Sequence, residues 1–237
     1  MIMSDTIQLE NDLLADTILE KTIEELKELK LPSKEYVNIA NALLDLAINS
    51  HKDIVPVEPD YFKDKKIDFP IQHDDIIIEK VKSGKQKKLL KEWTDSDYGK
   101  EFLLSRIDNI ERNLDDLLKD ETNIFGLIET VDKKPIGVMG YLNYDKLNNK
   151  AELRKLIGES EFTHKGYAKK ATEAWISYGL HTLKLRKIYI YTFDTNLRNI
   201  RINRELGFNL EGIFKAENLY NGIPRDIIRM GLIRDKV

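Results

Sequence analysis

Cysteine is absent from the 237 residues of the chain. Its absence excludes disulfides, a thiolate nucleophile and any cysteine-ligated metal. No apolar run approaches the roughly 18 residues that a membrane-spanning helix needs. The opening segment, MIMSDTIQLENDLL, also lacks the basic start and the apolar centre of a signal peptide. We therefore expect a cytoplasmic protein without a membrane partner.

The sequence also lacks an excess of charge of either sign. Its 38 Lys and Arg residues nearly balance 41 Asp and Glu residues, which gives a net charge of −3. This balance leaves no electrostatic footprint for nucleic acid, and we interpret the lysine-rich stretch EKVKSGKQKKLLKEW as a solvated helix face. The histidines show no metal-ligand spacing, so no metal cofactor is expected. They are His51, His73, His164 and His181.

What the chain does contain is 41% apolar and 33% charged residues, the composition of a soluble globular protein. Residues 1–50 show two stretches with helical spacing of apolar positions and are expected to form a helical accessory unit. Residues 51–75 hold three of the six prolines and no sustained period, which is typical of a linker. Strand and helix patterns alternate over 76–237. They include strands in AELRKLIGESEF and KIYIYTF, and Asn221-Gly222 predicts a closing hairpin. We expect an α/β fold there, with a mixed sheet of about six or seven strands flanked by helices.

One turn in this region suggests an anion site. In EFTHKGYAKKATEAW, a strand pattern passes into a helix pattern through Gly166. A helix that begins after glycine presents free N–H groups at the positive end of its dipole, and Lys165, Lys169 and Lys170 add positive charge. The turn matches neither a P-loop nor a dinucleotide-binding motif. It is therefore either a phosphate cradle or an ordinary loop with solvated lysines.

The order of several motifs resembles that of the GCN5-related N-acetyltransferases (GNAT). THKGYA is similar to their pyrophosphate loop, Q/R-x-x-G-x-G/A, although Thr163 stands at its first position. NLRNIRINRELGF is similar to the segment N-x-x-S-I-x-L-Y-E-K-L-G-F. The closing EGIFKAENLYNGIPRDIIRMGLI resembles the end of the subfamily that acetylates ribosomal proteins, polyamines and amino sugars. The resemblance covers 76–237 and implies a splayed sheet that binds acetyl-CoA.

The resemblance also implies which residues bind the cofactor. The backbone groups of the fourth strand would hold the pantetheine arm and the thioester oxygen, the glycine turn would hold the pyrophosphate, and two asparagines would contact coenzyme A. These residues are Leu156, Ile157 and Gly158 on the strand, Thr163, His164, Lys165, Gly166, Tyr167 and Ala168 at the turn, and Asn196 and Asn199.

Acetyl transfer to an amine needs a base for the acceptor and a proton for the departing sulfur. Glu152, which matches a glutamate at the start of the family's fourth strand, is the candidate base; its alternative role is a strand-edge carboxylate paired with Arg154 or a lysine. At the position where many members carry a tyrosine acid, this chain has Asn203, which cannot act as an acid at neutral pH. A water or another tyrosine could replace it; the candidates are Tyr189, Tyr191 and Tyr220.

For the acceptor, we expect Tyr191 and Asp226 to contribute to binding, although Asp226 could instead complete a turn. The implied function is acetyl-CoA-dependent N-acetylation of a primary amine of a small metabolite, with an amino sugar preferred. Direct transfer follows from the absence of cysteine. A longer acyl-CoA donor, or a non-catalytic CoA-binding or scaffold module, are the competing interpretations. The helices of 1–50 could dock on their own chain or across a homodimer.

Overall fold

The computed structural model describes residues 20–49, 67–82, 84–96, 99, 114–220 and 222–234. The chain divides into two compact units, Met1–Ser50 and His51–Val237. In the first unit, a helix over residues 20–28 precedes α2 (Ser33–Asn49), and the Tyr36 hydroxyl donates a hydrogen bond to the Leu26 carbonyl oxygen at 3.0 Å. The earlier part of the first predicted helix, and the predicted linker up to residue 66, lie outside the described residues.

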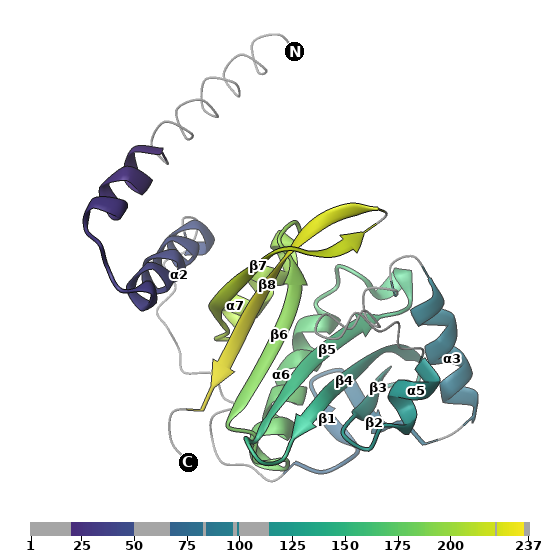
Figure 1. The fold of residues 1–237 in the computed structure, drawn as a ribbon. Helices are drawn as coiled ribbons and strands as arrows, with labels where there is room; N and C mark the ends of the chain where they lie inside the picture. The colour runs from purple at the N-terminus through teal and green to yellow at the C-terminus, as the bar shows by residue number, and fades with distance from the viewer. Residues whose placement is uncertain are drawn as a thin grey trace. The chain divides into compact units, whose positions relative to one another are not determined.

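The second unit is built on one sheet of eight strands, in the order β1-β2-β3-β4-β5-β6-β8-β7 (Figure 1). Neighbouring strands are antiparallel, except that β5 and β6 are parallel. The strands are β1 (Ile71–His73), β2 (Ile76–Lys80), β3 (Ile124–Thr130), β4 (Pro135–Asp145), β5 (Lys150–Ile157), β6 (Lys187–Phe193), β7 (Asn209–Tyr220) and β8 (Ile223–Ile233). The predicted α/β class with a mixed sheet is thus confirmed.

The strand count exceeds the expected six or seven because a strand lies within the stretch interpreted as a linker. β1 has only three residues, and its single buried side chain, Ile71, pairs in register with Ile78 of β2. A three-residue strand is too short to show a period-2 pattern, so the prolines near it dominated the sequence signal.

Helices cover both faces of the sheet, as the alternation along β5 shows. Leu153 and Ile157 pack in a cluster with Trp175 of α6, whereas Leu156 packs with Leu90 of α3 and Leu117 of α5. α7 joins the α6 cluster, and Figure 1 shows α3 and α5 apart from α6. The helices are α3 (Gly84–Asp95), α5 (Leu114–Lys119), α6 (Tyr167–His181) and α7 (Leu197–Glu205), with a 3-10 turn, η2 (Ser160–Phe162), before α6.

The parallel strands β5 and β6 separate soon after they meet. They pair over three residues only, ending where Glu152 lies opposite Tyr189. Beyond that point β5 stays with β4 as far as Ile157, and β6 stays with β8 as far as Phe193. The sheet is therefore open between its two halves, and the backbone edges that face this opening are not used for pairing between β5 and β6.

The last two strands form the predicted hairpin. Tyr220 pairs with Ile223 at its end, while Asn221 of the turn lies outside the described residues. Ala216 has a positive φ of 51° inside a register shift of β7 between Phe214 and Asn218. The hairpin is thus an irregular, twisted ribbon rather than a regular one.

Candidate active site

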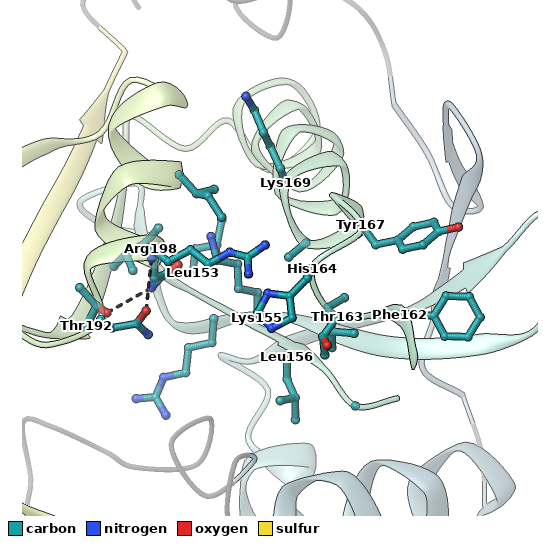
Figure 2. Close-up of a pocket in the computed structure, with 18 of the residues that line it drawn as sticks. Leu153, Lys155, Leu156, Phe162, Thr163, His164, Tyr167, Lys169, Thr192 and Arg198 are labelled. Atoms are coloured by element: carbon teal, nitrogen blue, oxygen red, sulfur yellow. Dashed lines mark hydrogen bonds between the residues drawn. The ribbon is translucent and has the colours of Figure 1, made fainter. Parts of the chain in front are cut away.

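A pocket of about 580 Å³ lies where the sheet opens (Figure 2). Its lining comes mainly from β5 and β6, from η2 and the turn that leads into the start of α6, and from α7. Residues of both sheet faces contribute, because Lys155 of β5 belongs to the face of α6 and Arg154 to the opposite face. The pocket therefore connects the two sides of the sheet.

The glycine turn forms one end of this pocket. Gly166 precedes α6 with φ 87° and ψ −10°, a left-handed conformation that glycine adopts without strain, and provides no side-chain cap for the helix. A side-chain carbon at Gly166 would meet no atom within 4 Å, so the approach to the first N–H groups of α6 is open. This arrangement fits an anion such as a pyrophosphate.

Not every residue predicted to bind the cofactor at the turn lines the pocket. Lys165 does not line the pocket; its ammonium lies 5.5 Å from the centroid of the Phe162 ring. The turn residues that do line the pocket are Thr163, His164, Gly166, Tyr167 and Ala168.

On β5, the predicted residues Leu156, Ile157 and Gly158 all line the pocket. The Gly158 amide, however, donates a hydrogen bond to the Ile136 carbonyl oxygen at 2.9 Å and is not free for a ligand. A side-chain carbon at Gly158 would lie 2.1 Å from the Trp93 indole. Gly158 is therefore required for packing, and the expected role of its backbone in holding the cofactor stays a prediction that its N–H group does not serve.

The two asparagines of α7 lie at the pocket and also build the helix. The Asn196 side chain caps α7 by accepting a hydrogen bond from the Asn199 amide at 3.2 Å. The Asn199 side chain donates to the Thr192 hydroxyl of β6 at 3.2 Å (Figure 2). The first contact caps α7 and the second ties its start to the β6 wall of the opening, so these residues shape the pocket whether or not they touch a ligand.

Glu152 lies at the point where β5 and β6 separate. It is 2% exposed, and the Nε of Arg154 donates a hydrogen bond to its carboxylate at 2.7 Å. The pairing with Arg154 that the sequence left open is therefore present, and Glu152 lines the pocket as well. A buried carboxylate held by one guanidinium contact still has lone pairs for a water or an amine.

Of the three tyrosines considered as acids, only Tyr191 lines the described pocket. Burial, and then the nearby charge of Glu152, raise the pKa of Tyr189 well above its usual value, and the Arg229 guanidinium lies 4.5 Å from its ring. Tyr220 packs on Phe193 with ring centroids 5.5 Å apart. Tyr189 and Tyr220 are therefore placed as packing residues.

Asp226 lies outside the pocket lining. Its carboxylate accepts hydrogen bonds from the Lys215 ammonium at 2.5 Å and from the Ala216 amide at 2.8 Å. The contact with Lys215 holds the pKa of Asp226 below its usual value. Asp226 thus stabilises the irregular part of the β7–β8 ribbon, the alternative that the sequence left open, and its role in binding the acceptor stays a prediction.

Sequence reasoning missed several polar residues of the pocket. Lys155 alternates with apolar residues on β5, and Thr192 stands in an apolar strand; a polar residue inside such a pattern is the signal that could have found them. Arg198 lies next to the predicted Asn199. The missed residues of this kind are Lys155, Thr192 and Arg198, whereas Lys169, which the sequence indicated as a positive charge at the turn, also lines the pocket.

The residues that the structure describes hold neither a cluster of metal-ligating side chains nor a membrane-spanning helix. Among those residues there is no group of three or more His, Asp or Glu side chains placed to hold a metal ion. Likewise, no helix in the described ranges is both long enough and apolar enough to cross a membrane.

Comparison with known proteins identifies the fold. Residues 82–209 match the family model of the acetyltransferase (GNAT) domain. Spermidine N(1)-acetyltransferase of Escherichia coli K12 is 32% identical over 99 residues, which are 42% of this chain and 53% of that protein. The match thus spans about half the length of that relative. The Vibrio cholerae enzyme of the same name is 26% identical over 129 residues, 54% of this chain and 74% of the relative.

Solved structures give the same result for the fold. A dodecameric structure of spermidine N-acetyltransferase from Vibrio cholerae superposes with a TM-score of 0.58 at 19% identity, over 67% of this chain and 94% of that one. The family model covers more than half of the sequence, and the opened sheet and the glycine turn lie inside the matched region. By its sequence and its fold, this chain belongs to the GNAT acetyltransferase family.

Proposed function

We propose that the protein is an acetyl-CoA-dependent N-acetyltransferase that acts on a primary amine of a small metabolite. The observation that carries the proposal is the opening between β5 and β6, which leads from the uncapped start of α6 to the buried carboxylate of Glu152. One pocket thus provides an anion site at one end and a base at the other.

Acetyl-CoA would supply an activated thioester whose carbonyl carbon accepts the amine. The N–H groups at the start of α6 hold the pyrophosphate, and the unpaired edge of β5 after Glu152 holds the pantetheine arm and the carbonyl oxygen. Glu152 removes a proton from the acceptor ammonium, directly or through a water, and Arg154 holds the carboxylate in place. The acceptor enters on the face of Glu152 and Tyr191.

For the acceptor we propose a polyamine. Both relatives named above are spermidine N-acetyltransferases, and the amino sugar preferred from the sequence gains no support from them. A polyamine carries several ammonium groups on a flexible apolar chain, which suits a pocket with a buried carboxylate and aromatic walls. We assign the catalytic domain to 76–237 and an accessory role to 1–50.

The assembly is proposed to contain more than one chain. A relative of this fold has been solved as a dodecamer, and the sequence-based expectation was a homodimer. Light scattering of the purified protein, with and without CoA, measures the mass directly. We further expect a small-molecule partner rather than nucleic acid, because the net charge of −3 gives no general attraction to phosphate backbones.

The test is a matrix of acyl donors and amines. CoA release is measured with acetyl-, propionyl- and octanoyl-CoA against spermidine, spermine, putrescine and glucosamine 6-phosphate. We expect the highest kcat/KM for acetyl-CoA with spermidine or spermine. Faster reaction with octanoyl-CoA would favour the longer-acyl interpretation. CoA binding without turnover of any amine would favour the non-catalytic module.

A further inference from the structure

Lys155 is a lysine on the inner wall of the pocket, in the middle of β5. Its side chain lies on the face of α6 and α7, opposite to Glu152, and is partly buried. The Lys155 ammonium donates a hydrogen bond to the side-chain oxygen of Asn203 at 2.9 Å. This contact runs from β5 to α7 beside the opening of the sheet.

The partner of this lysine, Asn203, is a neutral amide. It is fully buried, with 0% of the residue exposed, and its amide nitrogen has no hydrogen-bond partner in the described part of the structure. Leaving a buried polar group unpaired costs stability, roughly 1–3 kcal/mol. The side chain is held with its oxygen toward Lys155 nevertheless, which points to a role for that contact.

The surroundings of Lys155 disfavour its charged ammonium form. Its partner is a neutral amide, and within the described ranges no carboxylate forms an ion pair with it. Desolvation without a countercharge disfavours the ammonium form, so the pKa of Lys155 falls to about 7. A group with this pKa can both give and regain a proton near neutral pH.

We propose that Lys155 is the catalytic acid of the transfer, which protonates the departing CoA sulfur, and that Asn203 positions its ammonium. This inference rests on the proposed function. The acceptor nitrogen forms a bond to the acetyl carbon while the carbon–sulfur bond breaks and its electron pair stays on sulfur. The sulfur takes one proton from Lys155, which becomes a neutral amine and regains a proton from water. The acceptor ammonium loses two protons: Glu152 takes the first before the attack, and the second leaves the nitrogen for solvent as the amide forms.

The other titratable and charged groups of the pocket are less suited to this step. Arg154 and Arg198 do not release protons in proteins. Tyr191 turns its ring toward Phe214, with centroids 6.0 Å apart, and His164 stands at the glycine turn beside the anion site. Among the described residues that line the pocket, these groups are Glu152 and Arg154 on β5, Tyr191 on β6, His164 before α6, Tyr167 and Lys169 on α6, and Arg198 on α7.

Two substitutions at Lys155 distinguish proton donation from stabilisation by its positive charge alone. K155M keeps the length of the side chain without a proton, and K155R keeps a positive charge that cannot be given up. We expect the single-turnover rate constant to fall by about 10- to 1,000-fold in both variants, with a CoA dissociation constant close to that of the parent. In the pH–rate profile of the parent, the rate should fall as the pH rises through the pKa of Lys155. This alkaline limb of the profile should be absent from both variants.

Asn203 provides an independent measurement. In N203D, a carboxylate next to Lys155 favours the ammonium, so the alkaline limb of the rate should move to higher pH by about one unit or more. In N203L, which has a similar volume and no acceptor, the limb should move to lower pH or disappear. A purely structural role for the contact would change the rate or the stability without moving the limb.

The outcomes distinguish this inference from the proposed function. If the parent turns over no amine with any acyl-CoA, the proposed function is wrong and the role of Lys155 falls with it. If the parent is active and K155R keeps its rate and alkaline limb, Lys155 acts through charge alone and the proposal is overturned. CoA binding reports whether K155M is folded. If K155M is insoluble, N203D decides: an alkaline limb of its pH–rate profile at the same pH as in the parent overturns the proposal.

Discussion

Gly166 is the residue on which the anion site depends most directly. Its positive φ and the open space around it bring the N–H groups of α6 to the pocket without an intervening side chain. G166E would place a carboxylate against the pyrophosphate. We expect CoA affinity to fall by at least about 100-fold, as measured by calorimetry, because like charges repel at close range.

The matched control is G166A, which has the same unfavourable backbone conformation and no charge. Alanine at a left-handed position costs about 1–2 kcal/mol, so both variants should lose similar stability. CoA affinity should fall far less in G166A than in G166E. If a folded G166E variant binds CoA with the affinity of the parent, this turn is not the anion site.

Glu152 is the residue proposed to activate the acceptor. E152Q keeps the shape and the possibility of a contact with Arg154 but removes the basicity. We expect kcat to fall by about 10²- to 10⁴-fold, most strongly at low pH where the acceptor is protonated, with little change in CoA affinity. E161Q is the control, since Glu161 is exposed and pairs with Lys134 outside the pocket. A parental rate and pH profile in E152Q would make Glu152 a structural residue.

At the scale of elements, the start of α7 depends on one cap. N196A removes the acceptor for the Asn199 amide, which should cost about 1 kcal/mol of unfolding free energy, measured in urea. N196S can still cap the helix and should lie within a few tenths of a kcal/mol of the parent. If CoA affinity falls in N196A and not in N196S, Asn196 acts by fixing α7; an equal fall in both would indicate a direct contact with CoA.

The short strand β1 is joined to α6 by a pair that depends on pH. His73 Nε2 and Glu173 Oε2 lie 3.3 Å apart, and the hydrogen bond to Glu173 raises the pKa of His73 above 6.5. A raised histidine pKa stabilises the fold fully below about pH 6.5, the unfolded value, and this contribution disappears as the pH rises through the folded value. Because both groups are partly exposed to solvent, the effect is below about 1 kcal/mol.

E173Q should therefore be less stable than the parent at pH 5.5 and nearly equal to it at pH 8.5, in urea unfolding at both values. E205Q is the matched control, because Glu205 pairs with Lys169 of α6, the helix of Glu173, and the pKa of Glu205 is lowered. Its effect should be the same at both pH values. An effect of E173Q that does not change with pH would exclude a charged His73 from the pair.

The elements that the sequence predicted well are those with a sustained pattern. β6 coincides with the predicted KIYIYTF, and the Asn-Gly signal predicted the β7–β8 hairpin. The predicted strand that starts at Ala151 extends too far toward the C-terminus, because β5 ends at Ile157 and a turn follows. Glu159 there is held by the Trp93 indole at 2.9 Å, a contact across 66 residues that no local pattern contains.

At the scale of the whole molecule, the candidate site was predictable where its residues are adjacent in sequence and not where they meet in space. The glycine turn and the two asparagines came from contiguous motifs. The contact of Lys155 with Asn203 joins residues 48 positions apart across the opened sheet. The burial that lowers the pKa of Lys155 depends on that packing. Tertiary contacts of this kind have no signature in composition or period.

The helices of residues 1–50 form a unit of their own, and large apolar side chains remain on its surface, Leu29 at 63% and Leu43 at 52% exposed. The core clusters of the described residues all lie between Ile67 and Leu232, so a protein without 1–50 should fold and bind CoA with nearly the parental affinity. We expect the KM of the amine acceptor to rise, because the unit is proposed to contribute to acceptor choice. The control is L43S, which keeps the unit and makes its surface polar. Unchanged acceptor kinetics with a smaller oligomeric mass in light scattering would instead assign 1–50 to assembly.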